Sequence, residues 1–172
     1  GKGACKRDNR TISEKIGQAD MMRFGALEAG GTKMVCAIGK ENGEILERIS
    51  IPTETPDITM PKLLAYFQER EIKALGIGCF GPVDLHPESK TYGYITTTSK
   101  LAWRNYDFLG YFRDHLKVPL GFDTDVNGSM LGEATWGLAK GLDTALYITV
   151  GTGVGVGILA GGKLLHGMQH PE

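Results

Sequence analysis

A Gly-Gly-Thr-Lys tetrapeptide at residues 30–33 has the residue types and spacing to bind an anion. Glycines permit a tight turn that exposes several backbone N–H groups, and the threonine hydroxyl and lysine ammonium add further donors. The apolar runs on either side, Phe24–Leu27 and Met34–Ile38, predict two buried strands joined by this turn. An ordinary hairpin turn is the alternative, and this stretch alone favours it because Gly-Gly turns are common.

The same arrangement recurs near the end of the sequence. An apolar run that begins at Ala145 leads into Gly151, Thr152 and Gly153, and a second apolar run ends at Leu159. Neither turn has the Gly-x4-Gly-Lys-Ser/Thr spacing of a Walker P-loop. A repeated unit of strand, glycine turn and strand is what a nucleotide held between two similar lobes would need.

Asp125 is the candidate general base. It stands at the junction between a predicted strand over Val118–Phe122 and a predicted helix over Val126–Leu138, where its carboxylate can point into a cleft. A carboxylate there could accept the proton of a hydroxyl group that attacks a phosphate. The alternative is that Asp125 only caps the helix, the commoner outcome for such a residue, although Asp123 fits the capping role better.

Four further elements must position these residues. The hydrophobic pattern predicts strands over Glu44–Ile51 and Ala74–Gly78 and helices from Pro56 to about Arg70 and over Leu109–Leu116. The first three strands should be antiparallel neighbours, and the apolar side of the first helix should cover the sheet.

The segment after the strand that ends at Gly78 is expected to reach the mouth of a cleft. Gly81 lies in the irregular turn that leaves this strand, and ligands commonly meet such sheets at strand ends. Residues 85–103 are rich in Thr, Ser, Tyr and Gly and predict a loop or ribbon. Trp103 could contact a sugar, or it could be a packing anchor; the sequence favours neither role over the other.

The composition is that of an ordinary soluble globular protein. Of 172 residues, 41% are hydrophobic and 23% charged, and the formal net charge of −1 argues against bulk attraction to nucleic acid or membranes. No apolar run is long enough to span a bilayer, which favours the cytoplasm. Three widely spaced cysteines (Cys5, Cys36 and Cys79) indicate neither a disulfide framework nor a metal knuckle.

The residues also resemble a known family. The sequence resembles the amino-terminal half of sugar kinases of the ROK (repressor, open reading frame, kinase) family, and most of all its bacterial fructokinase branch. Five pieces carry the resemblance, in family order and spanning almost everything from Met22 onward: Glu28–Lys33, Gly78–Asp84, Thr124–Asn127 with Gly132-Glu133, Gly151–Gly155 and His170–Glu172.

The resemblance implies a role for each glycine turn. Gly30, Gly31, Thr32 and Lys33 would border the phosphates of ATP on one lobe, and the turn at residues 151–153, with Thr152 as the first choice for direct contact, would hold them from the other. It also assigns the general base to Asp125. Glucokinase-type members carry Asn immediately before this Asp, whereas this sequence has Thr124, which favours fructose or another hexose over glucose.

Asn127, Glu172, Gly81 and Trp103 are the residues expected on the sugar side, and Glu133 is expected to be structural. Glu28 replaces the commoner Asp of the first phosphate motif and can still bind Mg²⁺ through water. In the family, the His-Pro-Glu stretch leads into a structural zinc cluster. None of the zinc ligands is present in this sequence, so zinc is expected only in a carboxy-terminal part, and His170 is not expected to bind metal.

We therefore expect an α/β protein of the actin-like ATPase (hexokinase) fold. Residues 1–21 would be a leader or disordered segment, which includes a candidate helix over Thr11–Ala19 but is too short for a winged-helix DNA reader. Residues 22–119 would form a complete small amino-terminal lobe and residues 120–172 the truncated start of a larger lobe.

The expected reaction is ATP-dependent phosphorylation of a hexose, foremost D-fructose to fructose 6-phosphate, with Mg²⁺. The alternatives are a kinase for mannose, glucose or N-acetylmannosamine, or a sugar-sensing regulator without turnover. The expected partners are the hexose, ATP, the remaining carboxy-terminal half and, at full length, a second copy in a homodimer, with no nucleic acid and no membrane. The chain alone should be inactive.

Overall fold

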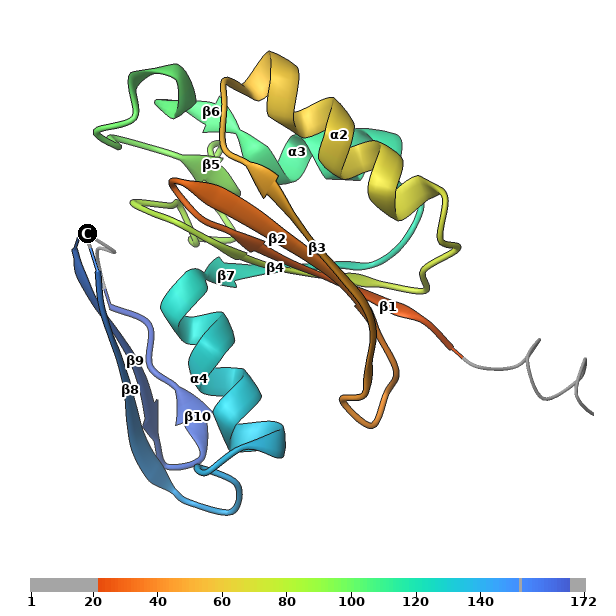
Figure 1. The fold of residues 1–172 in the computed structure, drawn as a ribbon. Coiled ribbons are helices and arrows are strands. Elements are labelled where there is room, and N and C mark those ends of the chain that lie inside the picture. Colours follow the sequence, from red (N-terminus) through yellow and green to blue (C-terminus); the bar gives the residue numbers. More distant parts are fainter. Residues whose placement is uncertain (1–21, 152, 168–172) are drawn as a thin grey trace, which may run out of the picture.

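A five-stranded sheet forms the centre of the amino-terminal part of the molecule (Figure 1). The computed structural model describes residues 22–151 and 153–167. The strand order is β3-β2-β1-β4-β7, with bounds β1 Phe24–Ala29, β2 Lys33–Gly39, β3 Ile45–Pro52, β4 Leu75–Cys79 and β7 Leu120–Thr124. Strands β1, β2 and β3 are antiparallel neighbours, as the sequence predicted, whereas β1, β4 and β7 run parallel.

Two helices cover one face of this sheet, α2 (Pro56–Gln68) and α3 (Phe108–His115) (Figure 1). Helix α2 begins with Pro56, which lacks the N–H that a first helical turn leaves unpaired. Its predicted apolar side is confirmed, because Leu63, Leu64 and Phe67 are buried against the sheet. These helices and the sheet form the main hydrophobic core, whose formation requires both layers.

The connection from β4 to α3 lies over the carboxyl ends of the parallel strands. It contains the short strands β5 (Tyr94–Ile95) and β6 (Tyr106–Asp107), which pair with each other, and a 3₁₀ turn, η1 (Leu101–Trp103). The predicted loop or ribbon is therefore confirmed as a mostly irregular segment with one small antiparallel pair.

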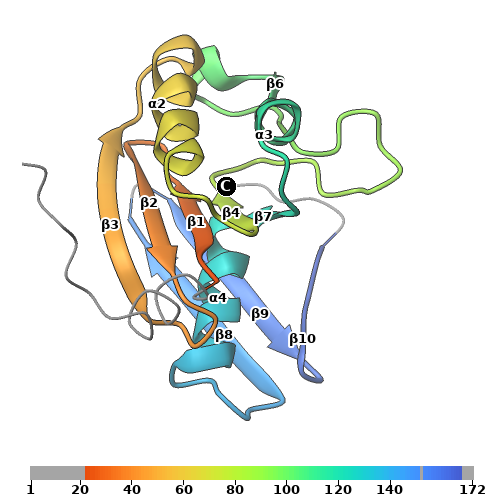
Figure 2. The ribbon, with the colours of Figure 1, turned by 90° about the vertical axis from the view of Figure 1, so that its right-hand side faces the viewer.

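Helix α4 (Asp125–Trp136) packs on the other face of the five-stranded sheet, and a three-stranded sheet covers it from outside (Figure 2). This second sheet has the order β10-β9-β8, with β8 Thr144–Val150, β9 Val154–Ala160 and β10 Lys163–Leu164. Helix and sheet approach closely at Gly157, where a Cβ atom would lie 2.4 Å from the Val126 carbonyl oxygen. A glycine is required there because no side chain fits.

The change from one sheet to the other comes after Thr124. Strand β7 pairs with β4 and belongs to the first sheet. The expected lobe boundary after residue 119 stays a prediction. The second unit has its own small core of Met130, Ala139 and Leu159.

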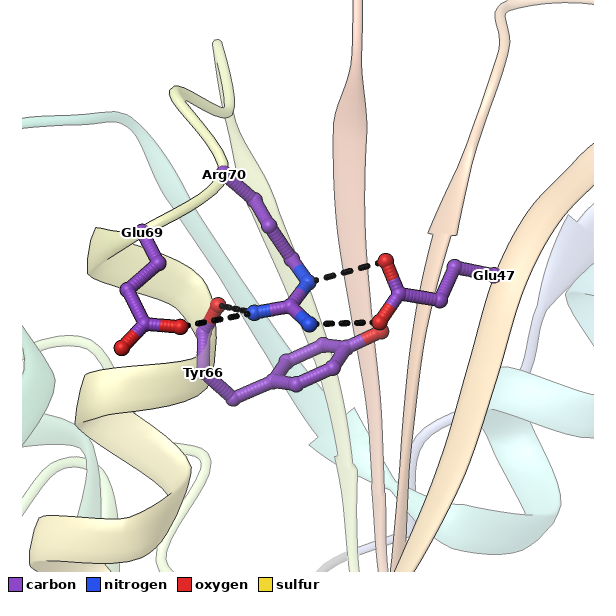
Figure 3. Close-up of polar contacts among 4 residues, drawn as sticks. All are labelled: Glu47, Tyr66, Glu69 and Arg70. Atoms are coloured by element: carbon purple, nitrogen blue, oxygen red, sulfur yellow. Dashed lines mark hydrogen bonds and ion pairs between the residues drawn. The ribbon is translucent and has the colours of Figure 1, made fainter. Parts of the chain in front are cut away.

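Arg70 ties the end of α2 to β3 (Figure 3). Its guanidinium donates to both carboxylate oxygens of Glu47 and to the Tyr66 carbonyl oxygen, and it lies 3.7 Å from the centre of the Tyr66 ring. Bidentate and stacked contacts of this kind fix geometry as well as adding stability, so they hold α2 in register over the sheet.

The expected leader and its candidate helix lie outside the described residues. Across residues 22–151 and 153–167, the longest helix has 13 residues, and none meets the requirements of length and apolarity for a bilayer span.

Candidate active site

Three of the sequence motifs meet at one edge of the five-stranded sheet. Ala29, Cys79 and Thr124 are the last residues of the parallel strands β1, β4 and β7, and they stand in register across the sheet. The chain continues from them into the 30–33 turn, into Phe80-Gly81, and into Asp125. Carboxyl ends of parallel strands are where α/β proteins bind ligands, so this edge is the candidate site.

The first glycine turn is held from behind by the end of β3. Gly30 N–H donates to the Lys33 carbonyl oxygen at 3.1 Å, and the Thr53 hydroxyl donates to the Gly30 carbonyl oxygen at 2.7 Å. A Cβ atom at Gly30 would lie only 2.5 Å from the Lys33 carbonyl oxygen, so the turn requires glycine. Thr32 and Lys33 are exposed, which leaves their donor groups toward solvent.

Asp125 occupies the first position of α4. The cap of this helix is Thr124, whose hydroxyl accepts from Asn127 N–H at 3.2 Å, so the capping alternative was wrong for both Asp125 and Asp123. The Asp125 carboxylate accepts from Val126 N–H at 2.9 Å and is only half buried. Because Thr124 fills the cap role, capping does not account for Asp125, and its role as the general base stays a prediction.

Burial raises the pKa of the Asp125 carboxyl above its ordinary value, and the negative charge of Glu28 raises it further. The hydrogen bond from Val126 N–H acts in the opposite direction. Glu28 lies on β1 in register with Gly78 of β4, against which the Asp125 backbone packs. The charge of Glu28 thus reaches Asp125 at this edge, where a cation or a proton is favoured.

Asp123, Asn127 and His166 form a hydrogen-bonded group beside Asp125. Asp123 accepts from the Asn127 amide at 2.8 Å and from His166 Nε2 at 2.6 Å. Asn127 is 3% exposed, which favours a role in holding the turn over direct contact with a sugar. His166 could not be predicted as part of this group, because nothing in a single sequence pairs it with a residue 43 positions earlier.

Trp103 and Glu133 both make contacts that bear on their expected roles. Trp103 is 2% exposed, its indole N–H donates to the Glu54 carbonyl oxygen at 2.9 Å, and its ring packs against Phe80 and Phe108. The structure favours the packing role for Trp103, since its donor is engaged inside the core. Glu133 accepts from Leu138 N–H at 2.9 Å at the end of α4, in keeping with its expected structural role.

The second glycine turn joins β8 to β9. Gly151 N–H donates to the Gly153 carbonyl oxygen at 2.9 Å, while Thr152 lies outside the described residues. A Cβ atom at Gly155 would lie 2.7 Å from Val126, the residue that follows Asp125. This contact brings the β8–β9 hairpin beside the start of α4, close to the candidate site.

Glu172 and His170 also lie outside the described residues. Within the described part, His, Cys, Asp and Glu side chains form no group of three that could hold a metal ion, so Glu28 and Asp125 could offer only a partial set of ligands.

Comparison with known proteins identifies the family. The profile of the ROK family matches residues 24–172. The chain belongs to the ROK family. A protein of Bacillus subtilis (strain 168) is 53% identical over 149 residues, which are 87% of this chain and 50% of that protein. The fructokinase of Pediococcus pentosaceus is 47% identical over 151 residues, which are 88% of this chain and 52% of the fructokinase.

A solved ROK structure supports the fold. The glucokinase of Streptomyces griseus in complex with glucose and AMPPNP superposes with a TM-score of 0.68 at 27% identity, over 87% of this chain and 47% of that chain. The expected actin-like ATPase fold of the ROK sugar kinases is confirmed. The chain spans about half the length of the curated relatives it matches, and it corresponds to their amino-terminal part.

Proposed function

We propose that the complete protein containing this chain transfers the terminal phosphoryl group of ATP to a hexose, foremost D-fructose, and releases fructose 6-phosphate and ADP. The observation that carries the proposal is the half-buried Asp125 carboxylate at the sheet edge where the 30–33 turn begins. The fructokinase relative adds support for the phosphoryl acceptor.

Asp125 would act as the general base. Phosphoryl transfer asks the protein mainly to align the attacking hydroxyl group and to stabilise charge on the phosphates. The Asp125 carboxylate would accept the hydroxyl proton as the new bond to phosphorus forms. Its raised pKa makes the ionised carboxylate a stronger proton acceptor, provided the pH lies above that pKa.

The two glycine turns would hold the phosphates. Gly30, whose N–H is bonded within the turn, would border the phosphates, while Gly31, Thr32 and Lys33 would supply backbone N–H groups, a hydroxyl and an ammonium from one side. The turn of Gly151, Thr152 and Gly153 would supply equivalent donors from the other side, because its hairpin packs beside the start of α4.

Mg²⁺ fits the donor set as a partner of the nucleotide. Glu28 offers a carboxylate at the same edge that can bind the ion through water, and Mg²⁺ typically takes one or two carboxylates, with phosphate oxygens and water as its other ligands. When bound, the ion would neutralise phosphate charge.

The sugar side would include Gly81 at the strand end, with Glu172 beyond the described residues, and Asn127 would act through Asp123. Thr124 caps α4 through its hydroxyl group and, as a threonine, lacks the side-chain amide that glucokinase-type members carry at this position. This difference is the reason for placing fructose before glucose.

The remaining carboxy-terminal half would complete the site. Strands β8 and β9 expose one apolar face, since Leu146, Ile148, Val150, Val154 and Val156 are each 44–78% exposed. An apolar surface of this kind normally packs against another layer. We therefore propose that the remaining carboxy-terminal half covers this apolar surface and that the chain alone lacks activity. The complete protein would act in the cytoplasm, where ATP and hexose are both available.

A coupled assay of ADP release on the complete protein tests the proposal with fructose, mannose, glucose and N-acetylmannosamine. The expected result is turnover with the highest kcat/KM for fructose. Sugar binding without ADP release would favour the sugar-sensing alternative. Neither binding nor turnover with any of the four would overturn the proposal.

A further inference from the structure

The side chain of Lys100 lies over the first glycine turn. A Cβ atom built on Gly31 would come 2.6 Å from Lys100 Cε and 3.7 Å from Lys100 Nζ. The ammonium group therefore ends beside the turn, although 69 positions separate the two residues. The end of this exposed lysine side chain occupies the space that a side chain at position 31 would take, so the contact places the ammonium group at the turn.

Hydrogen bonds on both sides of Lys100 hold its backbone in place. The indole N–H of Trp103 donates to the Glu54 carbonyl oxygen and anchors the segment in the core. The backbone N–H of Trp103 donates to the Lys100 carbonyl oxygen at 2.8 Å. Lys100 N–H donates to the Thr98 hydroxyl at 3.3 Å, and the Arg104 guanidinium donates to the Thr98 carbonyl oxygen at 3.1 Å. The backbone that carries the lysine is thus held at both sides.

The Lys100 ammonium has no acidic partner within the described residues. Other lysines do have one: Lys40 pairs with Glu44 and Lys62 pairs with Glu54, each at 2.8 Å. For Lys100, only the backbone groups make hydrogen bonds in the part of the chain that the structure covers. An exposed cation beside a glycine turn, without an anion of its own, is suited to an anionic ligand.

We propose that Lys100 binds a phosphate group seated on the Gly30–Gly31 turn. The inference rests on the proposed kinase function and adds to it a cation that lies outside the glycine motif. The ammonium is a compact point charge with three donors, which suits a phosphate oxygen. Together with Lys33, it would place two positive charges at the turn.

The test compares Lys100→Met and Lys100→Arg with Lys90→Met in the complete protein. Lys90 is the matched control, because it is an exposed lysine on the same connection between β4 and α3. Titration calorimetry measures the affinity of each variant for ADP, for AMPPNP and for fructose 6-phosphate, and a coupled assay measures kcat/KM. Thermal unfolding checks that each variant is folded.

The expected result is a loss of about 10- to 100-fold in affinity for at least one of the three ligands in Lys100→Met, the range for a lost hydrogen bond from a charged group. Lys100→Arg should retain most of the affinity, and Lys90→Met should match the wild type. A loss of affinity for AMPPNP alone would assign Lys100 to the terminal phosphate of ATP. A loss for both AMPPNP and ADP would assign it to the inner phosphates, and a loss for fructose 6-phosphate would assign it to the phosphate of the product.

Unchanged affinity for all three ligands in Lys100→Met would overturn the inference while leaving the kinase proposal intact. If the wild type itself binds none of the three ligands and shows no turnover, both proposals fail.

Discussion

His166 donates a hydrogen bond from Nε2 to the Asp123 carboxylate at 2.6 Å, and thereby joins the chain after β10 to the strand that leads into Asp125. Asp123 also accepts from the Asn127 amide in the first turn of α4. One carboxylate therefore connects three elements that flank the candidate general base. Asp125 follows Asp123 by two residues, so the orientation of its carboxylate depends on how this turn is held.

Replacement of His166 should reduce catalysis more than stability. His166→Ala removes the donor to Asp123, and we expect kcat/KM for the hexose to fall roughly 10-fold, the scale of a hydrogen bond to a charged group. His166→Gln can still donate through its amide and should recover part of the loss. Steady-state kinetics on the complete protein measure both. If His166 were merely structural, His166→Ala would lower Tm and leave kcat and KM unchanged.

Gly78 makes room for Asp125, and filling that room should impair the site. A Cβ atom at Gly78 would lie 3.2 Å from Asp125 Cα and 3.4 Å from the Thr124 carbonyl oxygen, both backbone atoms. Gly78→Ala should therefore shift the start of α4 by a few tenths of an ångström, and kcat should fall at least 10-fold because catalysis is sensitive to such displacement.

Gly76→Ala is the control for Gly78→Ala, since Gly76 lies on the same strand with nothing within 4 Å of its Cβ position. We expect this variant to keep wild-type kcat. Equal activity of the two alanine variants in the coupled assay would show that the close approach at Gly78 does not matter for the site.

Trp103 should contribute to stability as a packing anchor. Trp103→Ala should lower the free energy of unfolding by about 3–5 kcal/mol, the usual cost of removing a large buried aromatic side chain. Trp103→Phe should cost about 1–3 kcal/mol, because the Glu54 carbonyl oxygen loses its donor. Trp136, which is 58% exposed, serves as the comparison: Trp136→Phe should cost less than about 0.5 kcal/mol. Urea unfolding provides all three values, and equal costs at the two positions would contradict the anchor role.

Folding stability should depend on pH through Asp125. Its pKa in the folded protein is raised by burial and by Glu28 above the ordinary value of 3.8, so the folded state binds this proton more tightly than the unfolded chain. The contribution is fully present below pH 3.8 and is lost as the pH rises through the raised pKa.

Asp125→Asn cannot ionise at this position, so it avoids the loss of stability that ionisation of Asp125 causes. The variant should have a higher free energy of unfolding than the wild type at neutral pH, and this difference should shrink as the pH falls toward 3.8. Urea unfolding of both proteins from pH 4 to pH 8 measures the difference. A constant difference across this range would show that the Asp125 carboxyl does not titrate as described.

Much of the fold could be predicted because its signals are local. The runs Phe24–Leu27 and Met34–Ile38 indicate the β1–β2 hairpin, and the structure extends these strands by only one or two residues at their ends. The glycine turn was recognisable from residue type and spacing, whereas Asp125 was selected as the candidate base by the resemblance to the ROK family. Their meeting at one sheet edge follows from the parallel order of β1, β4 and β7.

The rest depended on contacts between residues far apart in the sequence. No periodicity connects Lys100 with Gly31 or His166 with Asp123, and these contacts exist only once the sheet and its connections have formed. The cap of α4 was assigned to the wrong residue because Asp123, Thr124 and Asp125 are all good capping residues, and only the backbone geometry selects Thr124.

The turnover number of Asp125→Asn in the complete protein is the most direct test of the central claim that the Asp125 carboxylate accepts the hydroxyl proton of the hexose. Asparagine keeps the size of the side chain and removes the base. We predict that kcat for ADP release with fructose falls about 10²- to 10⁴-fold, while the affinity for AMPPNP changes little. A kcat within a few-fold of the wild type would contradict the claim.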